Sequence, residues 1–529
     1  MINWIKEQRK DQLLLYYILL LIPPALLINT GLNPFILDEA TRADVALEMI
    51  FSGDFLHPTI NGEPYLNKPP LFNWLQVISC SLTGNFSEFS FRLPVIISLL
   101  LFGFTVYTTQ KEMYNRKVAF LSALALITSG RILFYDSFRG LMDISFSWII
   151  YLLFWSVYRY GMKKDFKRLF ISSYLFASVA FLMKGMPAFV FLAISLLAFF
   201  IYTRQFRKLF TTGHLLGFVL MALVLSAYLV GFSRNVPLSE YFGTLWSESS
   251  KRTFLDNSLW DSIKHLFEFP LDFVYHFAPW SLLLVLLLKK GNRKKIGEHQ
   301  ASRIFLLLVL ANIPVYWLSP AIFPRYLFMF LPLLFGILFH VLEENKGDWM
   351  YRLISLGLGI LSVCLILLML ASPWLADRSL YGKFWISYGI ILVLILALLL
   401  MLKKGYSNIP AVTIAVLLVS RITFNLYVLP DRLANESHQK QKNGAILAGQ
   451  ISDSRPLLIV PGTRIHHASS FYIMRERKET LLFSEGEFQP EVLYIIEKEK
   501  REEYPPHEII YEFETRIEAT KLCLVRFIY

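Results

Sequence analysis

Long apolar runs separated by short polar segments dominate the first 430 residues of the chain. Each run holds roughly 18 to 22 residues with almost no charge, which is the length an α-helix needs to cross a bilayer core. The pattern predicts about thirteen spans, at 13–32, 92–110, 117–134, 143–159, 169–184, 186–203, 213–232, 270–288, 303–319, 325–342, 353–371, 384–402 and 409–429. A further run at 69–84 is too short to span comfortably, because a helix of that length rises only about 24 Å.

The Lys and Arg residues between the spans predict the orientation. Dense basic segments occur near the N-terminus and at 111–117, 159–168, 204–208, 289–295 and 403–404. Basic loops mark the cytoplasmic side, and all of these fall on one side only if residues 69–84 do not cross. We therefore expect a cytoplasmic N-terminus, an interfacial outer helix that begins at Pro69-Pro70, and long outer loops at 33–91 and 233–269.

The composition changes after residue 430. Short apolar stretches of β type occur at 457–460, 492–496, 509–513 and 522–528, and 466–475 is a helical segment between them. This alternation predicts a small α/β domain at 431–529 on the outer face. Residues 1–430, which include the first outer loop, then form the transmembrane domain.

Composition and charge exclude two other classes of protein. Of the 529 residues, 55% are hydrophobic and 17% are charged, against about 25% charged in soluble proteins. The net charge of +12 could indicate nucleic-acid binding, but residues 431–529 hold 14 Lys/Arg against 16 Asp/Glu. The excess of Lys and Arg therefore lies in the membrane part, where it indicates the orientation of the spans. Nucleic acid is not an expected partner.

Candidate chemistry lies in the predicted outer loops. Asp38-Glu39 follow the first span and open a short helix, where acids stabilise the N-terminus and could also act as bases. Lys68 precedes Pro69-Pro70 and is either an interfacial anchor or a phosphate-binding cation. Both motifs therefore have a structural and a functional interpretation.

Further polar residues mark the outer ends of later spans. Arg139 and Asp143 have the spacing of a helical ion pair. Lys184-Gly185 forms a very tight turn, in which a cation indicates an anionic partner. Arg325-Tyr326 lie in another outer turn.

Together these loops offer a carboxylate pair and several isolated cations, which is equipment for holding a lipid phosphate and deprotonating an alcohol. The sequence contains no Gly-rich phosphate loop and no HExxH motif, so nucleotide chemistry is not expected. The pair His466-His467 lies in a predicted exposed loop and has no expected role.

The order of these motifs also resembles a known family. The residues that carry the resemblance are Asp38-Glu39, Ala43-Asp44-Val45-Ala46, Glu48-Met49, Ser52-Gly53-Asp54, Pro58, Asn61-Gly62, Tyr65, Lys68-Pro69-Pro70, Trp74, Arg92-Leu93-Pro94, Asp143, Lys184-Gly185, Pro279-Trp280, Tyr326 and Leu331-Pro332. Over nearly its whole length the chain resembles GT-C membrane glycosyltransferases, in the branch of the bacterial lipid A aminoarabinose transferases and the dolichyl-phosphate-mannose protein mannosyltransferases.

The resemblance implies a GT-C fold and an inverting glycosyltransferase of the inner membrane. Its donor would be a polyprenyl-phosphate sugar, such as an undecaprenyl one, and its acceptor a hydroxyl or phosphate of a lipid A-like glycolipid, a protein or a glycan. By this resemblance Asp38, assisted by Glu39, would be the catalytic base. Lys68, Lys184, Arg325 and Tyr326 would bind the donor phosphate, while Arg42, Arg139 and Asp143 would support the site.

The chain departs from the family pattern at several positions. The family commonly has Arg three residues after the Asp, where this chain has Thr41 followed by Arg42. Some members hold zinc through a Glu and a His at positions that here look like Asn67 and Ser249, which are poor zinc ligands. No zinc or other cofactor is therefore expected. A Lys common before the late Tyr is absent, and Arg325 is the expected substitute.

Two alternative functions would use the same polyprenyl lipids. A transporter or flippase would place ionisable residues at the bilayer midplane, and Arg131 and Arg421 are the residues that fit this description. An O-antigen-type ligase would use polyprenyl donors without this first-loop pattern. The residues leave the sugar, the acceptor and the prenyl length open.

Overall fold

The structure, a computed structural model, describes residues 2–250, 259–375, 384–403, 408–435, 437–515 and 520–528. Lys404 of the predicted basic loops and residues 251–258 of the predicted second outer loop lie outside the described residues. The chain forms two compact units. The first unit comprises Met1–Ile28, Val95–Val230 and Leu238–Val428, and the second comprises Asn29–Pro94, Gly231–Pro237 and Leu429–Tyr529.

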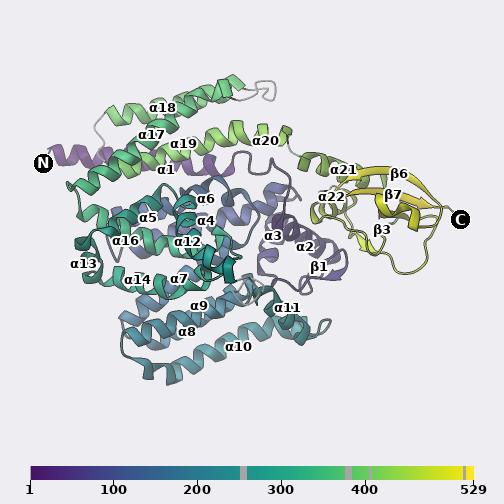
Figure 1. The fold of residues 1–529 in the computed structure, drawn as a ribbon, viewed down its shortest axis with the longest axis horizontal. Coiled ribbons are helices and arrows are strands. Elements are labelled where there is room, and N and C mark those ends of the chain that lie inside the picture. Colours follow the sequence, from purple (N-terminus) through teal and green to yellow (C-terminus); the bar gives the residue numbers. More distant parts are fainter. Residues whose placement is uncertain are drawn as a thin grey trace. The chain divides into compact units, whose positions relative to one another are not determined.

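The first unit is helical (Figure 1). Its elements are α1 (Ile2–Leu27), most of α4 (Glu88–Gln110), α5 (Arg116–Ile127), α6 (Gly130–Phe134), η1 (Asp136–Phe138), α7 (Asp143–Met162), α8 (Phe166–Lys184), α9 (Pro187–Tyr202), η2 (Phe206–Phe210), most of α10 (Thr212–Phe232), α11 (Leu238–Ser250), α12 (Leu259–His276), η3 (Trp280–Leu288), α13 (Lys290–Glu298), α14 (Gln300–Asn312), α15 (Pro314–Trp317), η4 (Pro324–Phe330), α16 (Leu331–Glu344), α17 (Trp349–Leu375), α18 (Phe384–Lys403), α19 (Ile409–Thr423) and the π-helical η6 (Phe424–Val428). Within it, α7, α8 and α9 pack on one another, α14 packs on α9 and α16, and α19 packs on α1 and α17.

Eight helical segments of the described residues are long and apolar enough to cross a membrane. They are Glu88–Gln110, Phe166–Lys184, Thr212–Phe232, Gln300–Trp317, Pro324–Glu344, Trp349–Ser372, Phe384–Met401 and Ile409–Leu433. A ninth results if Arg116–Ile127 and Gly130–Phe138, which meet at 43°, form one bent span. The count of about thirteen remains a prediction, because the helices Gln12–Leu27 and Pro187–Tyr202 are apolar but shorter.

The predicted span 270–288 is not a single helix. Its first part belongs to α12, which ends at His276, and its second part is the 3₁₀ helix η3. Pro279 stands between them, and proline has no N–H to continue an α-helical ladder. The span was predicted from its apolar composition, which is the same on both sides of the break between α12 and η3.

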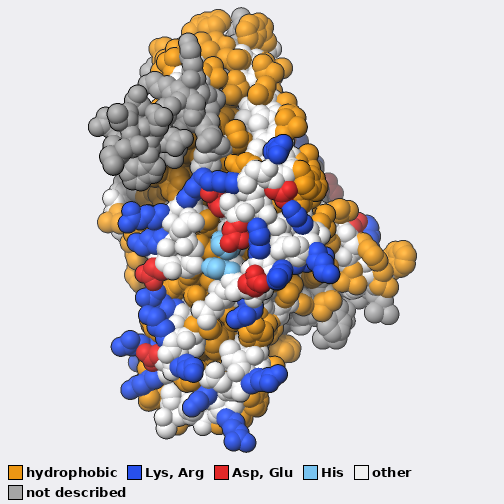
Figure 2. Space-filling model, turned by 90° about the vertical axis from the view of Figure 1, so that its left-hand side faces the viewer, with side chains coloured by type: hydrophobic (Ala, Val, Ile, Leu, Met, Phe, Trp, Pro, Cys, Tyr) orange, Lys and Arg blue, Asp and Glu red, His pale blue; other side chains and the backbone are white. Residues whose placement is uncertain are grey.

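One face of the molecule is rich in basic side chains. Helix α13 lies at the left edge of Figure 1, and Figure 2 views the molecule from that side, where Lys and Arg are spread over the centre and hydrophobic side chains flank them. Ion pairs of the same unit include Lys117–Glu343 at 3.0 Å. The basic segment 289–295 of the sequence forms part of α13.

The second unit combines the first outer loop with the C-terminal residues. Its elements are α2 (Asp38–Ser52), β1 (Thr59–Ile60), β2 (Glu63–Pro64), α3 (Leu71–Thr83), α20 (Leu429–Asn435), α21 (Ser437–Ile451), β3 (Leu457–Ile459), α22 (His467–Arg477), β4 (Leu482–Phe483), β5 (Leu493–Glu497), η7 (Lys498–Glu503), β6 (His507–Glu514) and β7 (Lys521–Phe527). The sheet has the order β4-β3-β5-β7-β6, with β4, β3 and β5 parallel and β7 antiparallel to both neighbours.

The predicted α/β character of the C-terminal residues is confirmed. The four predicted apolar stretches became β3, β5, β6 and β7, and 466–475 became α22, whereas the two-residue strand β4 was not predicted. The predicted helix at 69–84 is α3, which starts directly after Pro70. The prediction grouped residues 33–91 with the membrane part, but in the structure these residues share a hydrophobic core with α22 and the sheet.

Candidate functional site

The predicted site residues fall into two groups, one in each compact unit. In the first unit, Asp143 is the first residue of α7 and Lys184 is the last residue of α8. A helix N-terminus stabilises a carboxylate and a C-terminus stabilises a cation, so each residue suits its end. Gly185 ends α8 with a left-handed φ of 90° that favours glycine. The tight turn predicted at Lys184-Gly185 is therefore present.

Asp143 lies between two cations. Its Oδ1 accepts a hydrogen bond from Lys184 Nζ at 2.5 Å, and its Oδ2 lies 3.2 Å from Arg325 Nε. All three side chains are buried. Two cations thus meet at one buried carboxylate, and an anion brought close to them would interact strongly because the surroundings are poorly solvated. The arrangement is therefore suited to receive an anion.

Aromatic rings complete this cluster. Lys184 Nζ lies 3.7 Å from the centroid of the Tyr326 ring, and the Arg325 guanidinium lies 4.2 Å from the ring of Phe323. Tyr326 is itself buried. Cation–π contacts of this kind hold both cations in place without neutralising their charge.

Other charged residues of this unit have partners that the sequence did not indicate. Arg131 donates to Asp136 at 2.7 Å and lies over the Tyr135 ring. Arg139 also lies over that ring, 5.0 Å from its centroid.

Arg421 donates to the carbonyl of Ala25 at 3.2 Å and lies 4.6 Å from the centroid of the Phe138 ring. Arg131 and Arg421, which the transporter hypothesis could have used, are thus packed against neighbouring helices.

In the second unit the two adjacent acids of α2 differ. Asp38 is exposed, whereas Glu39 is buried and accepts two hydrogen bonds from Arg92, at 2.6 and 3.1 Å. The side chain of Arg92 is itself fully buried. Of these two carboxylates, Asp38 is the one that solvent can reach.

Arg42 and Lys68 occupy different surroundings. Arg42 is buried, donates to the Tyr65 hydroxyl and lies 4.7 Å from the centroid of that ring. Its carbonyl accepts a bond from Asn73 of α3, so Arg42 joins α2 both to α3 and, through Tyr65, to the segment before α3. Lys68 is half-buried two residues before Pro70, where α3 begins.

A buried acidic group in the second unit was not predicted. Asp44 and Glu48 lie one turn apart on α2 and are both buried. The backbone N–H groups of Asn61 and Gly62 donate to Glu48, and His467 Nδ1 lies 3.4 Å from the carboxylate of Asp44. His467 thus contacts a buried carboxylate, although its loop position indicated no role. Spacing on one helix could have paired the two acids, but no local pattern identifies His467.

Protonation of Glu48 is expected to couple to stability. Burial and the neighbouring Asp44 raise the pKa of Glu48 from 4.5 to about 7. The folded state then binds a proton that the unfolded state has released, so the stability that Glu48 contributes is fully present below pH 4.5 and is lost as the pH rises through 7. The loss amounts to about 3 kcal/mol.

Thermal unfolding at several pH values checks this expectation. Between pH 5 and pH 8 the Tm of the wild type should fall by more than that of Glu48→Gln, which cannot ionise. Glu63→Gln, a change at an exposed residue of the same loop, should behave as the wild type. Equal pH dependence in wild type and Glu48→Gln would contradict the assignment.

The sequence of this chain is similar to those of known membrane glycosyltransferases. Residues 67–230 match the family described as dolichyl-phosphate-mannose-protein mannosyltransferase. An uncharacterised protein of Aquifex aeolicus is 27% identical over 55% of this chain and 59% of its own length. The undecaprenyl phosphate-α-4-amino-4-deoxy-L-arabinose arabinosyl transferase of Erwinia tasmaniensis is 24% identical over 66% of this chain and 64% of its own. The chain thus spans about 60% of the length of these curated relatives.

The crystal structure of ArnT from Cupriavidus metallidurans bound to undecaprenyl phosphate matches 97% of both chains with a TM-score of 0.69 and 16% identity. Its apo form matches with a TM-score of 0.67. The chain has the GT-C fold. It resembles the aminoarabinose transferases, as its sequence motifs indicated, and together with the apolar helices this makes it a multi-pass membrane protein.

Proposed function

We propose that the protein is an inverting glycosyltransferase that moves a sugar from a polyprenyl-phosphate donor to a hydroxyl or phosphate of an envelope acceptor. The observation that carries the proposal is the buried cluster in which Lys184 and Arg325 both contact Asp143. In this reaction the bond from the anomeric carbon to the phosphate oxygen breaks, and negative charge develops on the departing phosphate. Fixed cations that receive this charge lower the barrier.

The remaining predicted residues take roles in the same proposal. Asp38, which is exposed at the start of α2, accepts the proton of an acceptor hydroxyl as that oxygen attacks the anomeric carbon. Glu39 holds Arg92 and is assigned a positioning role in place of the catalytic one first expected. Tyr326 and Lys68 contribute to phosphate binding, and Arg42 and Arg139 support the site.

The proposal includes an orientation in the inner membrane. The N-terminus lies in the cytoplasm and residues 431–529 lie outside, as the distribution of Lys and Arg predicts. The basic face in Figure 2, which includes α13, supports the cytoplasmic assignment of that side. Accessibility labelling of single cysteines introduced at exposed positions of α13 and β6 tests the two sides.

The activity is tested with purified protein in lipid nanodiscs. Undecaprenyl phosphate that carries 4-amino-4-deoxy-L-arabinose, the sugar in the relatives' names, is the first donor, and lipid A is the first acceptor. Mass spectrometry should detect free undecaprenyl phosphate and a modified acceptor. Envelope glycolipids and glycoproteins of a deletion strain then identify the natural acceptor. An unchanged envelope together with movement of a labelled polyprenyl lipid across vesicles would instead indicate a flippase.

We further propose that the protein holds no zinc at the positions where some family members do. Asn67 and Ser249 stand there, and amide and hydroxyl oxygens are poor zinc ligands. The Ser249 hydroxyl donates to the carbonyl of Leu245 at 2.8 Å, within its own helix. Elemental analysis of purified protein should find zinc well below a stoichiometric amount, and stoichiometric zinc would overturn the proposal.

A further inference from the structure

The backbone directly before Asp38 has an unfavourable conformation. Leu37 has φ 51° and ψ −137°, a region that residues with a Cβ rarely adopt. Its side chain is 60% exposed, so burial of Leu37 does not compensate for the strain. The bonds from Glu39 N to Ile36 O and from Ala40 N to Leu37 O then start α2. A strained conformation persists where the surrounding structure fixes it from both sides.

Arg92 fixes the chain on both sides of this turn. Besides its two bonds to Glu39, it donates to the carbonyl of Thr30 at 2.7 Å and to that of Pro34 at 3.3 Å. One buried guanidinium therefore joins the chain before Leu37 to the helix after it.

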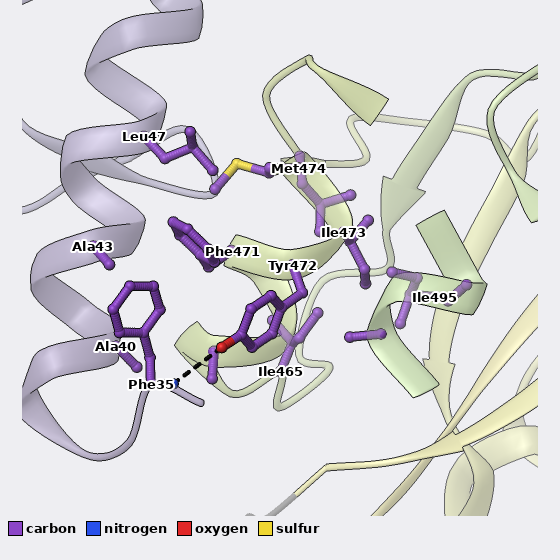
Figure 3. Packing of buried hydrophobic residues seen from close by; sticks show 14 of the residues in the cluster. Phe35, Ala40, Ala43, Leu47, Ile465, Phe471, Tyr472, Ile473, Met474 and Ile495 are labelled. Atoms are coloured by element: carbon purple, nitrogen blue, oxygen red, sulfur yellow. Dashed lines mark hydrogen bonds between the residues drawn. The ribbon is translucent and has the colours of Figure 1, made fainter. Parts of the chain in front are cut away.

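Tyr472 of α22 also fixes the segment before Leu37. The backbone N–H of Phe35 donates to the Tyr472 hydroxyl at 3.0 Å, drawn as a dashed line in Figure 3. The same hydroxyl donates to Glu88 at 2.9 Å, and Glu88 also accepts from Lys442 of α21 at 2.5 Å. Burial holds the pKa of Tyr472 well above its ordinary value, so the hydroxyl keeps the proton that it donates.

Apolar packing extends this contact. The Phe35 ring meets the Phe471 ring edge to face at 4.8 Å and stacks near Tyr472 at 6.2 Å. Figure 3 shows Leu47 of α2 and Met474 of α22 facing one another in the same core. The segment that precedes Asp38 is thus held by residues that lie more than 400 positions later in the chain.

We propose that Tyr472 is a positioning residue, through which the C-terminal domain holds the strained turn at Leu37 and so sets the orientation of Asp38. This inference rests on the proposed function for the role of Asp38, and it gives the C-terminal domain a part in the reaction. Tyr472 acts through Phe35 and does not itself react.

The test compares two Tyr→Phe variants within the same domain. Tyr472→Phe removes the acceptor of the Phe35 N–H, whereas Tyr494→Phe removes a similar acceptor, that of the Gln489 N–H at 2.9 Å, in a separate core. Both tyrosines are buried. Tyr472→Phe also removes the donor to Glu88. We expect it to lower kcat about tenfold, the effect of losing the bond that holds Phe35, with the KM for the undecaprenyl-linked donor unchanged. Tyr494→Phe should keep the wild-type kcat, and an equal loss in both variants would overturn the inference.

Hydrogen exchange separates this inference from the proposed function. Peptides covering residues 30–40 should exchange faster in Tyr472→Phe than in Tyr494→Phe, whatever reaction the protein performs. Unchanged exchange in those peptides would overturn the positioning role even if kcat fell. A transfer assay that fails with every donor, together with faster exchange, would overturn the proposed function and leave the contact established.

A double variant tests whether the backbone strain at Leu37 connects the Tyr472 contact to kcat. Glycine adopts the Leu37 conformation without a Cβ penalty. In Leu37→Gly the turn should therefore depend less on the contacts that hold the backbone in this conformation. In the Leu37→Gly background, Tyr472→Phe should lower kcat by a clearly smaller factor than in the wild type. Equal factors in the two backgrounds would show independent sites and would contradict the proposed link.

Discussion

Asp38→Asn is expected to lower the rate of sugar transfer by roughly 10²- to 10⁴-fold, the range in which a positioned general base contributes. Asn keeps the shape of the side chain but cannot accept the proton of the acceptor hydroxyl. Because Asp38 is exposed at the first turn of α2, its replacement should lower the Tm only slightly, through the weaker interaction with the helix N-terminus. Single-turnover transfer from undecaprenyl-linked sugar, measured beside the Kd for undecaprenyl phosphate, should show lost chemistry with unchanged donor binding.

Two further variants of the same loop serve as controls for Asp38. Glu63→Gln changes an exposed carboxylate and should leave the rate unchanged. Glu39→Gln weakens a buried ion pair with Arg92, and loss of one partner of such a pair costs about 3 kcal/mol, so its main effect should be a lower Tm. If Asp38→Asn retained full activity, Asp38 would be removed as the base. If Glu39→Gln had a normal Tm and no activity, the division of roles between the two acids would be wrong.

Lys184→Ala is expected to weaken binding of the donor phosphate by about 10- to 100-fold. The variant loses one of the two buried cations that contact Asp143, and with it the charge-assisted hydrogen bond that we propose for the phosphate. A hydrogen bond to a charged group contributes roughly 1.5–3 kcal/mol, which corresponds to this factor. Calorimetry with undecaprenyl phosphate in nanodiscs measures the Kd, and a thermal scan checks that the variant is folded.

Asp143→Asn is the matched variant, because it changes the same cluster in the opposite direction. Removing the carboxylate leaves two cations, so the phosphate should bind as tightly as to the wild type or more tightly. Opposite effects of Lys184→Ala and Asp143→Asn on the Kd would support an electrostatic role, and equal weakening by both would contradict it. Higher salt should reduce the difference only slightly, since buried charges are poorly screened.

Several features of the fold were predictable because they depend on local sequence. A helix in a bilayer satisfies its own backbone groups, so apolar length by itself marks candidate spans. Alternating apolar stretches gave four strands of the C-terminal sheet, and Pro69-Pro70 marked the start of α3. The break between α12 and η3 was not predictable from composition.

The candidate site was predictable as a set of residues but not as a set of contacts. Polar residues at span ends identified Asp143, Lys184 and Arg325 one by one, since ionisable groups there are costly without a partner. Their pairing depends on which helix ends pack together, and 41 positions separate Asp143 from Lys184. The same limit applies to Glu39 with Arg92 and to Asp44 with His467.

The sequence by itself determined that this is a membrane protein, which segments are candidate spans, that the C-terminal residues combine strands with helices, and which polar residues are candidates for chemistry. These properties follow from side-chain hydrophobicity, charge and helical spacing, which act over a few residues. Tertiary structure alone decided that Asp143 binds two cations, that Glu39 is buried against Arg92, and that Tyr472 of α22 holds the backbone next to Asp38. Such contacts arise when distant segments bury a common core, and no local pattern in the chain specifies which segments meet.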